Sequence, residues 1–258
     1  MIIYSWNMLF ENRKQDEALS FISKSDFDVF CLQEVPHQFL LSLQSLQYSI
    51  SSIEESIVIS KYRKFPIYSV ILSKHKIINQ DEIIFDTQER TFKVRLTRFF
   101  INLFNKEKVI AIQSHKALFV DVQVNGKALR IFNLHLSLTY PRRRMEEMKQ
   151  ILQKYKKDSS VICGDFNILE SFHVSVLNWL LGGTVSEWIF YRMERITMES
   201  LFKHFEMVNP LRHRSTHPIS HSQLDHILLP QGTRIIEAKV IHKRHGSDHC
   251  PIVLRFEL

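Results

Sequence analysis

Six short motifs carry the residue types that could bind a metal ion or transfer a proton. They combine carboxylates, side-chain amides and histidines, and each follows an apolar run that is typical of a strand. The motifs are Trp6-Asn7, Leu32-Gln33-Glu34, Asn133-Leu134-His135-Leu136, Gly164-Asp165-Phe166-Asn167, Leu224-Asp225-His226 and Ser247-Asp248-His249. Hard cations such as Mg²⁺ prefer oxygen ligands, and an imidazole with its ordinary pKa of about 6.5 exchanges protons near neutral pH. Together the motifs predict a site for metal-assisted acid–base chemistry.

Each motif taken alone also has a structural explanation. Asn7 could cap a turn, Glu34 could be a solvated strand end, and His135 could be a core histidine with satisfied hydrogen bonds. Residues 164–167 could form only a turn, because Gly, Asp and Asn are common in turns. The recurrence of such groups at the ends of six apolar runs favours a shared functional site.

Apolar runs bounded by polar stretches predict the elements that would carry these motifs. The chain opens as strand, helix and strand, at residues 2–6, 14–25 and 28–33. Helices are predicted after Pro141, a residue suited to a first helical turn, and over residues 170–181. Further strands are predicted at 55–60, 68–73, 76–85, 92–96, 117–124, 128–136, 160–164, 224–229 and 235–242, with a hairpin at Asn125-Gly126.

The composition is that of a globular protein with a sizeable core. Of the 258 residues, 45% are hydrophobic and 24% are charged, which argues against a disordered or fibrous chain. No repeat, linker or low-complexity segment interrupts the pattern, so we expect one domain over residues 1–258. Two blocks of strands and helices favour an α/β sandwich of two sheets with helices outside.

The charge and the cysteines bear on partners and location. A net charge of +7 attracts anionic partners such as nucleic acid, phospholipid headgroups or phosphate esters, although it could equally serve solubility. Three widely spaced cysteines are typical of a reducing compartment. The first residues do not resemble a signal peptide, and no apolar run reaches the roughly 18 residues that a membrane span needs. We therefore expect a cytoplasmic protein, with signal-independent export as the alternative.

In their order and spacing, the six motifs resemble those of the endonuclease/exonuclease/phosphatase family. Its members include deoxyribonuclease I, exonuclease III-type repair enzymes, neutral sphingomyelinases, inositol polyphosphate 5-phosphatases, deadenylases and tyrosyl-DNA phosphodiesterases. The resemblance extends from Asn7 to His249, nearly the whole chain. It implies a four-layer α/β sandwich in which two mainly antiparallel sheets lie face to face with helices outside. The active site would lie at one end of the two sheets.

The resemblance also implies a metal site. Asn7, Glu34 and Asp248 match the metal-binding positions, with Glu34 as the principal ligand. The implied ion is Mg²⁺, for which Mn²⁺ could substitute. Mg²⁺ keeps several of its waters, so one or two carboxylates and a phosphate oxygen are sufficient ligands. The chain would then be a magnesium-dependent phosphoric ester hydrolase.

The catalytic roles follow from the same resemblance. His249 matches the catalytic histidine, and Asp225 matches the carboxylate that orients its ring. Asp165 and Asn167 match the pair that aligns the water and donates to a phosphoryl oxygen. His135 matches the second histidine of the branch that includes deoxyribonuclease I and the sphingomyelinases, where it contacts the phosphate and helps the leaving group depart. The implied reaction is in-line attack of water on phosphorus, with Asp165 or His249 as general base and with one or two metal ions.

Departures from the family pattern narrow the substrate. Leu9 stands where repair endonucleases carry an acidic residue, and the motif at 133–136 replaces their tyrosine-containing segment. Residues 223–226 also differ from the Trp-Cys-Asp-Arg motif of the inositol 5-phosphatases. The first expectation is a phosphodiesterase or nuclease acting on nucleic acid. The alternatives are a phospholipid phosphodiesterase or small phosphate-ester phosphatase, and a non-catalytic binding protein with the same fold.

Three segments could select the substrate. Arg142, Arg143 and Arg144 could bind phosphates beyond the scissile one, or they could be the solvated start of a helix. The cationic face of strand 92–96 could follow a phosphate backbone, or the strand could be an ordinary half-buried one. The apolar residues 99–104 could insert at a membrane surface or belong to the core. No protein partner is implied, and we expect a monomer.

Overall fold

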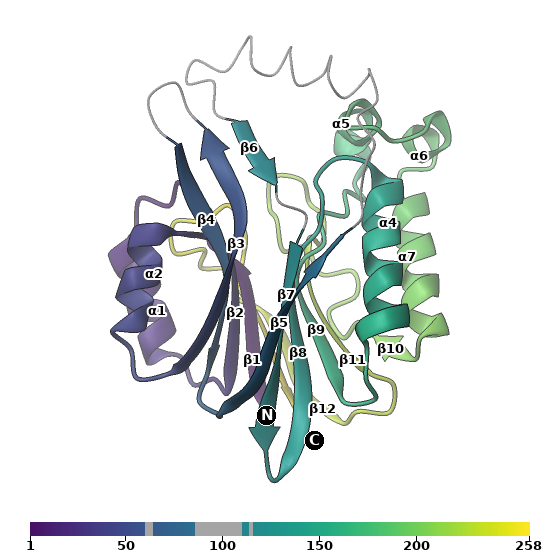
Figure 1. Cartoon of the computed structure of the whole chain (residues 1–258). Helices are drawn as coiled ribbons and strands as arrows, with labels where there is room; N and C mark the ends of the chain where they lie inside the picture. Colours follow the sequence, from purple (N-terminus) through teal and green to yellow (C-terminus); the bar gives the residue numbers. More distant parts are fainter. Residues whose placement is uncertain (60–63, 86–109, 114–115) are drawn as a thin grey trace.

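Two β-sheets lie face to face, and helices cover the outer side of each sheet (Figure 1). The computed structural model describes residues 1–59, 64–85, 110–113 and 116–258, with only the backbone described for 110–113. The four layers confirm the predicted α/β sandwich. The strand predicted at 92–96 and the apolar segment 99–104 lie outside the described residues. In the part of the chain that the structure describes, none of the helices is long and apolar enough to cross a membrane.

The first sheet has seven strands, and most of its neighbours are antiparallel. The exception is the parallel pair β1 and β2, which come from the strand–helix–strand opening of the chain. The strand order is β12 (Ile235–Val240), β13 (Ile252–Phe256), β1 (Ile2–Asn7), β2 (Val29–Pro36), β4 (Lys64–Ser73), β3 (Ser49–Ile59) and β6 (Ile110–Gln113). This arrangement brings the two ends of the chain together as neighbouring strands, β1 and β13.

The second sheet has six strands and one parallel pair, β8 and β9. Its strand order is β10 (Met207–Val208), β11 (Asp225–Pro230), β9 (Ser160–Asp165), β8 (Lys127–His135), β7 (Lys116–Val124) and β5 (Ile77–Ile84). The predicted hairpin joins β7 to β8, and both of its turn residues, Asn125 and Gly126, have positive φ. Each sheet therefore has a parallel pair at its centre whose carboxyl ends lie at the same edge.

Four helices complete the layers. The first sheet is covered by α1 (Gln15–Lys24) and α2 (His37–Gln44), which pack their apolar sides on Phe30 and Leu72 of the sheet. The second sheet is covered by α4 (Pro141–Gln150), its continuation η1 (Ile151–Tyr155), and α7 (Met193–His204). Two shorter helices, α5 (Ser175–Leu180) and α6 (Val185–Ile189), lie beyond the end of the second sheet (Figure 1).

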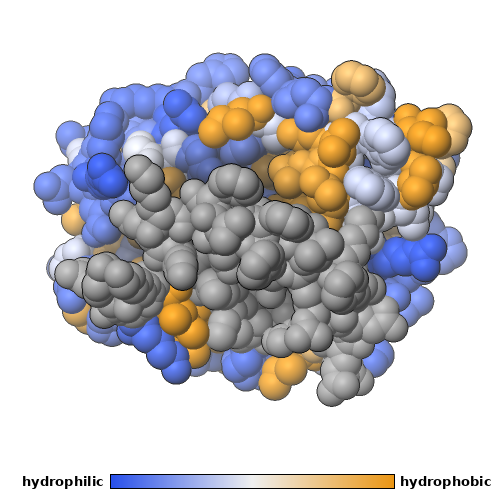
Figure 2. Space-filling view, turned by 90° about the horizontal axis from the view of Figure 1, so that it is seen from above, coloured by the Kyte–Doolittle hydropathy of each residue, from blue (hydrophilic) through white to orange (hydrophobic). Residues whose placement is uncertain are grey.

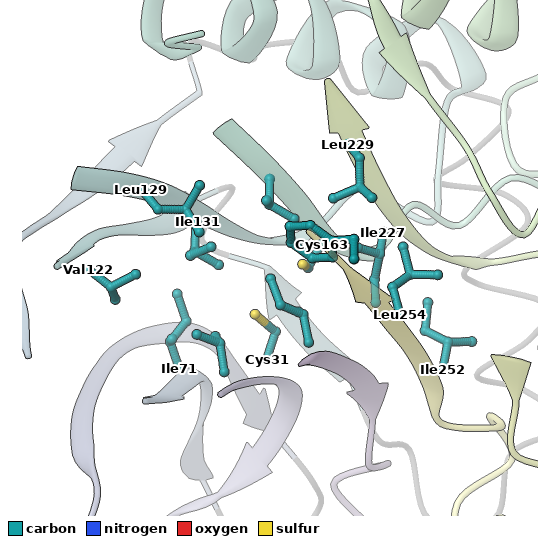
Figure 3. Packing of buried hydrophobic residues seen from close by; sticks show 14 of the residues in the cluster. Cys31, Ile71, Val122, Leu129, Ile131, Cys163, Ile227, Leu229, Ile252 and Leu254 are labelled. Carbon is teal, nitrogen blue, oxygen red and sulfur yellow. The ribbon is translucent and has the colours of Figure 1, made fainter. Parts of the chain in front are cut away.

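The main core fills the space between the sheets (Figure 3). Alternate residues of each strand face this space, because successive side chains point to opposite sides of a sheet. Ile71 of the first sheet and Val122 and Ile131 of the second are fully buried within it. Cys31 and Cys163 are buried in the same cluster as free thiols, in agreement with their apolar sequence context.

The helix predicted at 170–181 is shorter than expected. A single 3₁₀ turn, Phe172–Val174, comes first, and the α-helix begins only at Ser175. The reason is a tertiary contact, because Glu170 N donates to Ser222 Oγ and Ser171 Oγ donates to His221 O. The elements α2, α6, α7, β6 and β10 were not predicted; for α7, the spacing of Met198 and Phe202, both buried, was a usable signal.

Candidate active site

Polar residues from both sheets meet at the edge where the two parallel strand pairs end. Asn7 is the last residue of β1 and lies opposite Gln33 of β2. His135 and Asp165 are the last residues of β8 and β9 and lie opposite each other. Asp225 begins the antiparallel strand β11, and its register partner is again Asp165. Strand register within the two sheets therefore places five of the six motifs at this end of the sandwich.

A cavity of about 560 Å³ opens at this end. Seven of the predicted site residues line it: Asn7, Glu34, His135, Asp165, Asn167, Asp248 and His249. Asp225 lies behind His249 and is fully buried. The structure thus brings together every predicted catalytic and metal-binding residue, from segments up to 242 positions apart in the sequence (249 − 7).

His249 is held by a buried carboxylate. Its Nδ1 lies 2.8 Å from Asp225 Oδ2, and its Nε2 lies 3.8 Å from Asp165 Oδ2. Burial by itself would lower the pKa of His249, but the charges of Asp225 and Asp165 and the hydrogen bond to Asp225 raise it to about 10. The ring is therefore cationic at neutral pH in this structure and directs Nε2 toward Asp165.

His135 has an equivalent partner that the sequence did not reveal. Its Nδ1 pairs with Glu55 Oε1, and Glu55 also accepts hydrogen bonds from Ser69 Oγ (2.6 Å) and Glu34 N (3.2 Å). Burial by itself would lower the pKa of His135, but the charge and hydrogen bond of Glu55 and the charge of Asp165 raise it to about 10. Although burial by itself raises the pKa of Glu55, His135 lowers it below its ordinary value.

Glu55 was missed because no local pattern indicates it. It lies in β3 where the pairing register with β4 shifts between Glu54 and Ser56. Strict alternation is lost at such a shift, so the facing of a side chain cannot be read from the sequence. His135 thus belongs to a histidine–carboxylate pair, with its Nε2 3.7 Å from Asp165 Oδ2.

Glu34 occupies a strained position. Its φ is +54°, in the left-handed region that residues other than Gly rarely adopt, and the register between β2 and β4 shifts around it. Glu34 Oε1 accepts from Asn7 Nδ2 at 3.0 Å, and Oε2 accepts from Phe10 N at 3.2 Å. Burial, with a contribution from Glu55, raises the pKa of Glu34. The backbone distortion turns this carboxylate into the cavity, where a cation would favour its ionised form.

Asn7 presents its nitrogen to the cavity in this structure. Its Nδ2 donates to Glu34 Oε1 and, at 3.1 Å, to Asp165 Oδ2, while its Oδ1 accepts from Leu9 N at 3.0 Å. The amide therefore links two carboxylates, and its oxygen is already hydrogen-bonded within the first loop. These hydrogen bonds support a role for Asn7 in holding the carboxylates in place, and its role as a metal ligand stays a prediction.

The motif at residues 164–167 forms a tight turn over the cavity. Asp165 Oδ1 accepts from Asn167 N at 2.8 Å, and Asn167 has a φ of +54°. One amide hydrogen of Asn167 is used, because its Nδ2 donates to Leu136 O at 2.9 Å. The sequence allowed residues 164–167 to be only a turn, and a turn is present. The same turn places the side chains of Asp165 and Asn167 in the cavity.

Asp248 is accompanied by a third histidine, His217, which the sequence did not indicate. His217 Nε2 lies 3.5 Å from Asp248 Oδ2, and its Nδ1 lies 2.8 Å from Ser220 Oγ. Burial by itself raises the pKa of Asp248, but the hydrogen bond of His217 and the charges of His249 and His217 lower it to about 2. Ligand atoms of His217, Asp248 and His249 lie within 4.8 Å of one another.

The donor set fits a divalent cation. Five carboxylates surround the two histidines of raised pKa, so their negative charge exceeds the positive charge by three if all are ionised (5 − 2). The carboxylates are Glu34, Glu55, Asp165, Asp225 and Asp248. Burying unbalanced charge is costly, and a bound cation would offset it. Because the carboxylates supply oxygen ligands, the site suits Mg²⁺ or Mn²⁺.

Two buried amides join the sheets beneath this site. Gln33 Nε2 donates to Asn133 Oδ1 at 2.6 Å. Asn133 Nδ2 donates across the sandwich to Leu32 O (2.9 Å) and Val70 O (3.0 Å). These contacts give the polar residues of two motifs a structural role, because they link the strands that carry Glu34 and His135.

The arginine cluster at the start of α4 is not a phosphate-binding group as a whole. Arg144 is fully buried and pairs with Glu194, so the prediction that it binds substrate is wrong. Its guanidinium also donates to Ser137 O and Leu138 O, in the loop that precedes the helix. Arg143 lies 3.3 Å from Glu147 one helical turn later, and Arg142 is exposed. Only Arg142 and Arg143 remain candidates for binding phosphates.

Comparison with known proteins agrees with this geometry. The model of the Endonuclease/Exonuclease/phosphatase family matches residues 4–249. Among curated proteins, none matches the chain. A family protein from Leptotrichia buccalis has a TM-score of 0.68 and 16% identity, with 100% of both chains covered. D. rerio TDP2 complexed with single-strand DNA product has a TM-score of 0.60 and 16% identity, covering 100% of this chain and 99% of that one.

A phosphatase shares the fold as well. The mannosyl-6-phosphatase of Bacteroides thetaiotaomicron has a TM-score of 0.61 and 12% identity, with 100% of both chains covered. At these identities the likeness shows the fold alone, whereas the family model covers nearly the whole chain. The chain therefore belongs to the endonuclease/exonuclease/phosphatase family, and its fold indicates a phosphoester hydrolase.

Proposed function

We propose that this protein is a magnesium-dependent phosphodiesterase that hydrolyses its substrate by in-line attack of water. One observation carries the proposal. His135 Nε2 and His249 Nε2 lie 3.7 and 3.8 Å from the same atom, Asp165 Oδ2, and a separate buried carboxylate holds each ring from behind. Two such N–H groups at the floor of one cavity can donate to phosphoryl oxygens and offset the charge that develops on them.

The remaining residues have roles consistent with this chemistry. Glu34 and Asp248 would hold Mg²⁺, which when bound acts as a Lewis acid on a phosphoryl oxygen. Asn7 keeps the carboxylates of Glu34 and Asp165 in place through its two hydrogen bonds. Asp165 would orient the attacking water and accept its proton, because the raised pKa of His249 leaves that ring already protonated.

Asn167 and the paired histidines complete the proposed reaction. Asn167 lines the cavity and has one further amide hydrogen with which it would donate to the phosphate. His135, fixed by Glu55, would protonate or stabilise the departing oxygen. In both histidines, Nδ1 is paired with a buried carboxylate. This pairing leaves Nε2 as the nitrogen that faces the cavity.

Nucleic acid is the first candidate substrate. The net charge of +7 favours a polyanion, and the similar fold of TDP2 in complex with single-strand DNA product supports the idea. A phosphate ester with an apolar group is the second candidate, because many of the side chains that line the cavity are apolar. Arg142 and Arg143 would contact phosphates beyond the scissile one if the substrate is a nucleic acid.

A substrate panel tests the proposal. Single- and double-stranded DNA, RNA, sphingomyelin, inositol phosphates and a chromogenic phosphodiester are assayed with Mg²⁺ and with EDTA. We expect EDTA to abolish turnover and His249→Ala to lower kcat by about 10²- to 10⁴-fold. His242→Ala is the matched control, because His242 is exposed and does not line the cavity. If folded protein hydrolyses nothing in the panel, the chain is a non-catalytic member of its family.

A further inference from the structure

The cavity that holds the histidines has a second, apolar wall. Leu169, Leu181 and Leu224 form a small buried cluster together with Val174, and all four line the cavity. This cluster is separate from the two cores that pack the helices on the sheets. Val174 comes directly before α5 and Leu181 directly after it, so the α5 segment supplies part of the apolar lining.

Three exposed side chains continue this wall to the surface. Leu138, Leu177 and Ile219 also line the cavity, and they are 46%, 41% and 67% exposed. Figure 2 shows apolar side chains gathered on this end of the molecule, on the side where Figure 1 places α5 and α6. Exposed apolar surface beside a cavity is a characteristic of ligand sites, because covering it with an apolar group is favourable.

Apart from the paired histidines, the described lining offers no cationic side chain for the further phosphates of a polyanion. Among the described residues, neither lysine nor arginine lines the cavity. A second phosphate placed against the leucines and isoleucines of the described lining would be desolvated without compensation. An alkyl chain in the same place would bury apolar surface on both partners.

We propose that the cavity takes phosphate esters that carry an apolar chain, with the phosphate at His135 and His249 and the chain along Leu177 and Ile219. The inference rests on the proposed function, since it names the substrate class of the same site. The shared chemistry of the ligand is an anionic phosphate joined to an alkyl or acyl chain. Its source would be either a free amphiphilic ester or a lipid in a bilayer.

Binding of n-alkylphosphonates tests the inference without requiring turnover. The methyl, butyl, hexyl and octyl compounds are titrated by calorimetry into the whole protein with Mg²⁺, below their critical micelle concentrations. We expect Kd to fall with chain length, by up to about fourfold for each methylene that becomes fully buried. A Kd that does not depend on chain length, or no binding of any phosphonate, would overturn the inference.

Matched substitutions assign the effect to the wall. Ile219→Ser and Leu177→Asn should each weaken the dependence of Kd on chain length. Ile236→Ser is the control, because Ile236 is also exposed, at 56%, but lies on β12 and does not line the cavity. If both wall variants keep the full dependence on chain length, the chain binds elsewhere and the inference is wrong.

Two further arms separate the sources and the functions. The first arm is flotation with vesicles of sphingomyelin and phosphatidylserine. If the protein floats with the vesicles and Ile219→Ser does not, the ligand is a lipid in a bilayer. If binding depends on chain length but the protein does not float, the ligand is a free ester. If longer phosphonates bind more tightly but the protein hydrolyses no substrate, the apolar site is supported and the proposed function is contradicted. Efficient hydrolysis of oligonucleotides with no chain-length effect would support the function and overturn the inference.

Discussion

The guanidinium of Arg144 forms a two-pronged ion pair with the carboxylate of Glu194 inside the protein. Arg144 Nε and Nη2 donate to the two oxygens of Glu194 at 2.7 and 2.8 Å, and the side chains are 0% and 2% exposed. The same guanidinium donates to Ser137 O and Leu138 O. The pair therefore joins α4 to α7 and fixes the loop that follows His135 and forms part of the cavity wall.

Removing this ion pair should destabilise the whole protein. Arg144→Ala leaves the charge of Glu194 buried without its partner, and we expect the free energy of unfolding to fall by about 3–5 kcal/mol. Arg142→Ala on the same helix should change it by less than about 0.5 kcal/mol, because Arg142 is exposed. Urea denaturation measures both. Equal stability of the two variants would contradict the structural role of Arg144.

Glu55 should control the protonation of His135. Glu55→Gln removes the charge that raises the pKa of His135 to about 10, so we expect that pKa to fall by about 1–3 units. Asp225→Asn should act in the same way on His249 and leave His135 nearly unchanged. Titration of the ring signals by NMR measures each histidine separately. An unchanged His135 in Glu55→Gln would mean that Glu55 is not its partner in solution.

Gly164 should tolerate no side chain. Its φ is +137°, and a Cβ at this position would lie 1.9 Å from the carbonyl oxygen of Leu134 on the neighbouring strand. Gly164→Ala must separate β9 from β8, so we expect a loss of about 3 kcal/mol or more in the free energy of unfolding. Gly126→Ala is the comparison, because a Cβ there meets open space although φ is also positive. The prediction fails if thermal denaturation ranks Gly126→Ala as the more damaging change.

Glu147 should make stability depend on pH. Burial raises its pKa from the ordinary 4.5 to about 7, so the folded protein binds this proton more tightly than the unfolded chain does. Its contribution to stability is complete below about pH 4.5 and is lost as the pH rises through 7. Between pH 5 and pH 8, the free energy of unfolding of the wild-type protein should fall by roughly 2–3 kcal/mol more than that of Glu147→Gln. Urea denaturation at each pH measures both. Parallel pH profiles of the two proteins would disprove the shift.

The order of the motifs and the apolar runs were enough to predict the architecture. A strand that is covered on both faces, such as β9, carries a continuous apolar run, here Val161–Cys163. A helix that covers a sheet, such as α1, has apolar residues spaced by about one turn. These signals are local in the chain. The polar residues that flank such strands, Asn7, Asp165 and His249 among them, could therefore be identified before their positions in space were known.

Tertiary structure alone decided which groups are partners. Glu55 meets His135 across 80 positions, and Glu194 meets Arg144 across 50, so no short pattern records either pair. The same holds for the apolar wall, whose members Leu177 and Ile219 look like ordinary core residues in the sequence. Burial, charge pairing and the exposed part of a side chain depend on what the rest of the chain places beside it. For this reason Arg144 is a buried structural residue, although in the sequence it resembles its exposed neighbour Arg142.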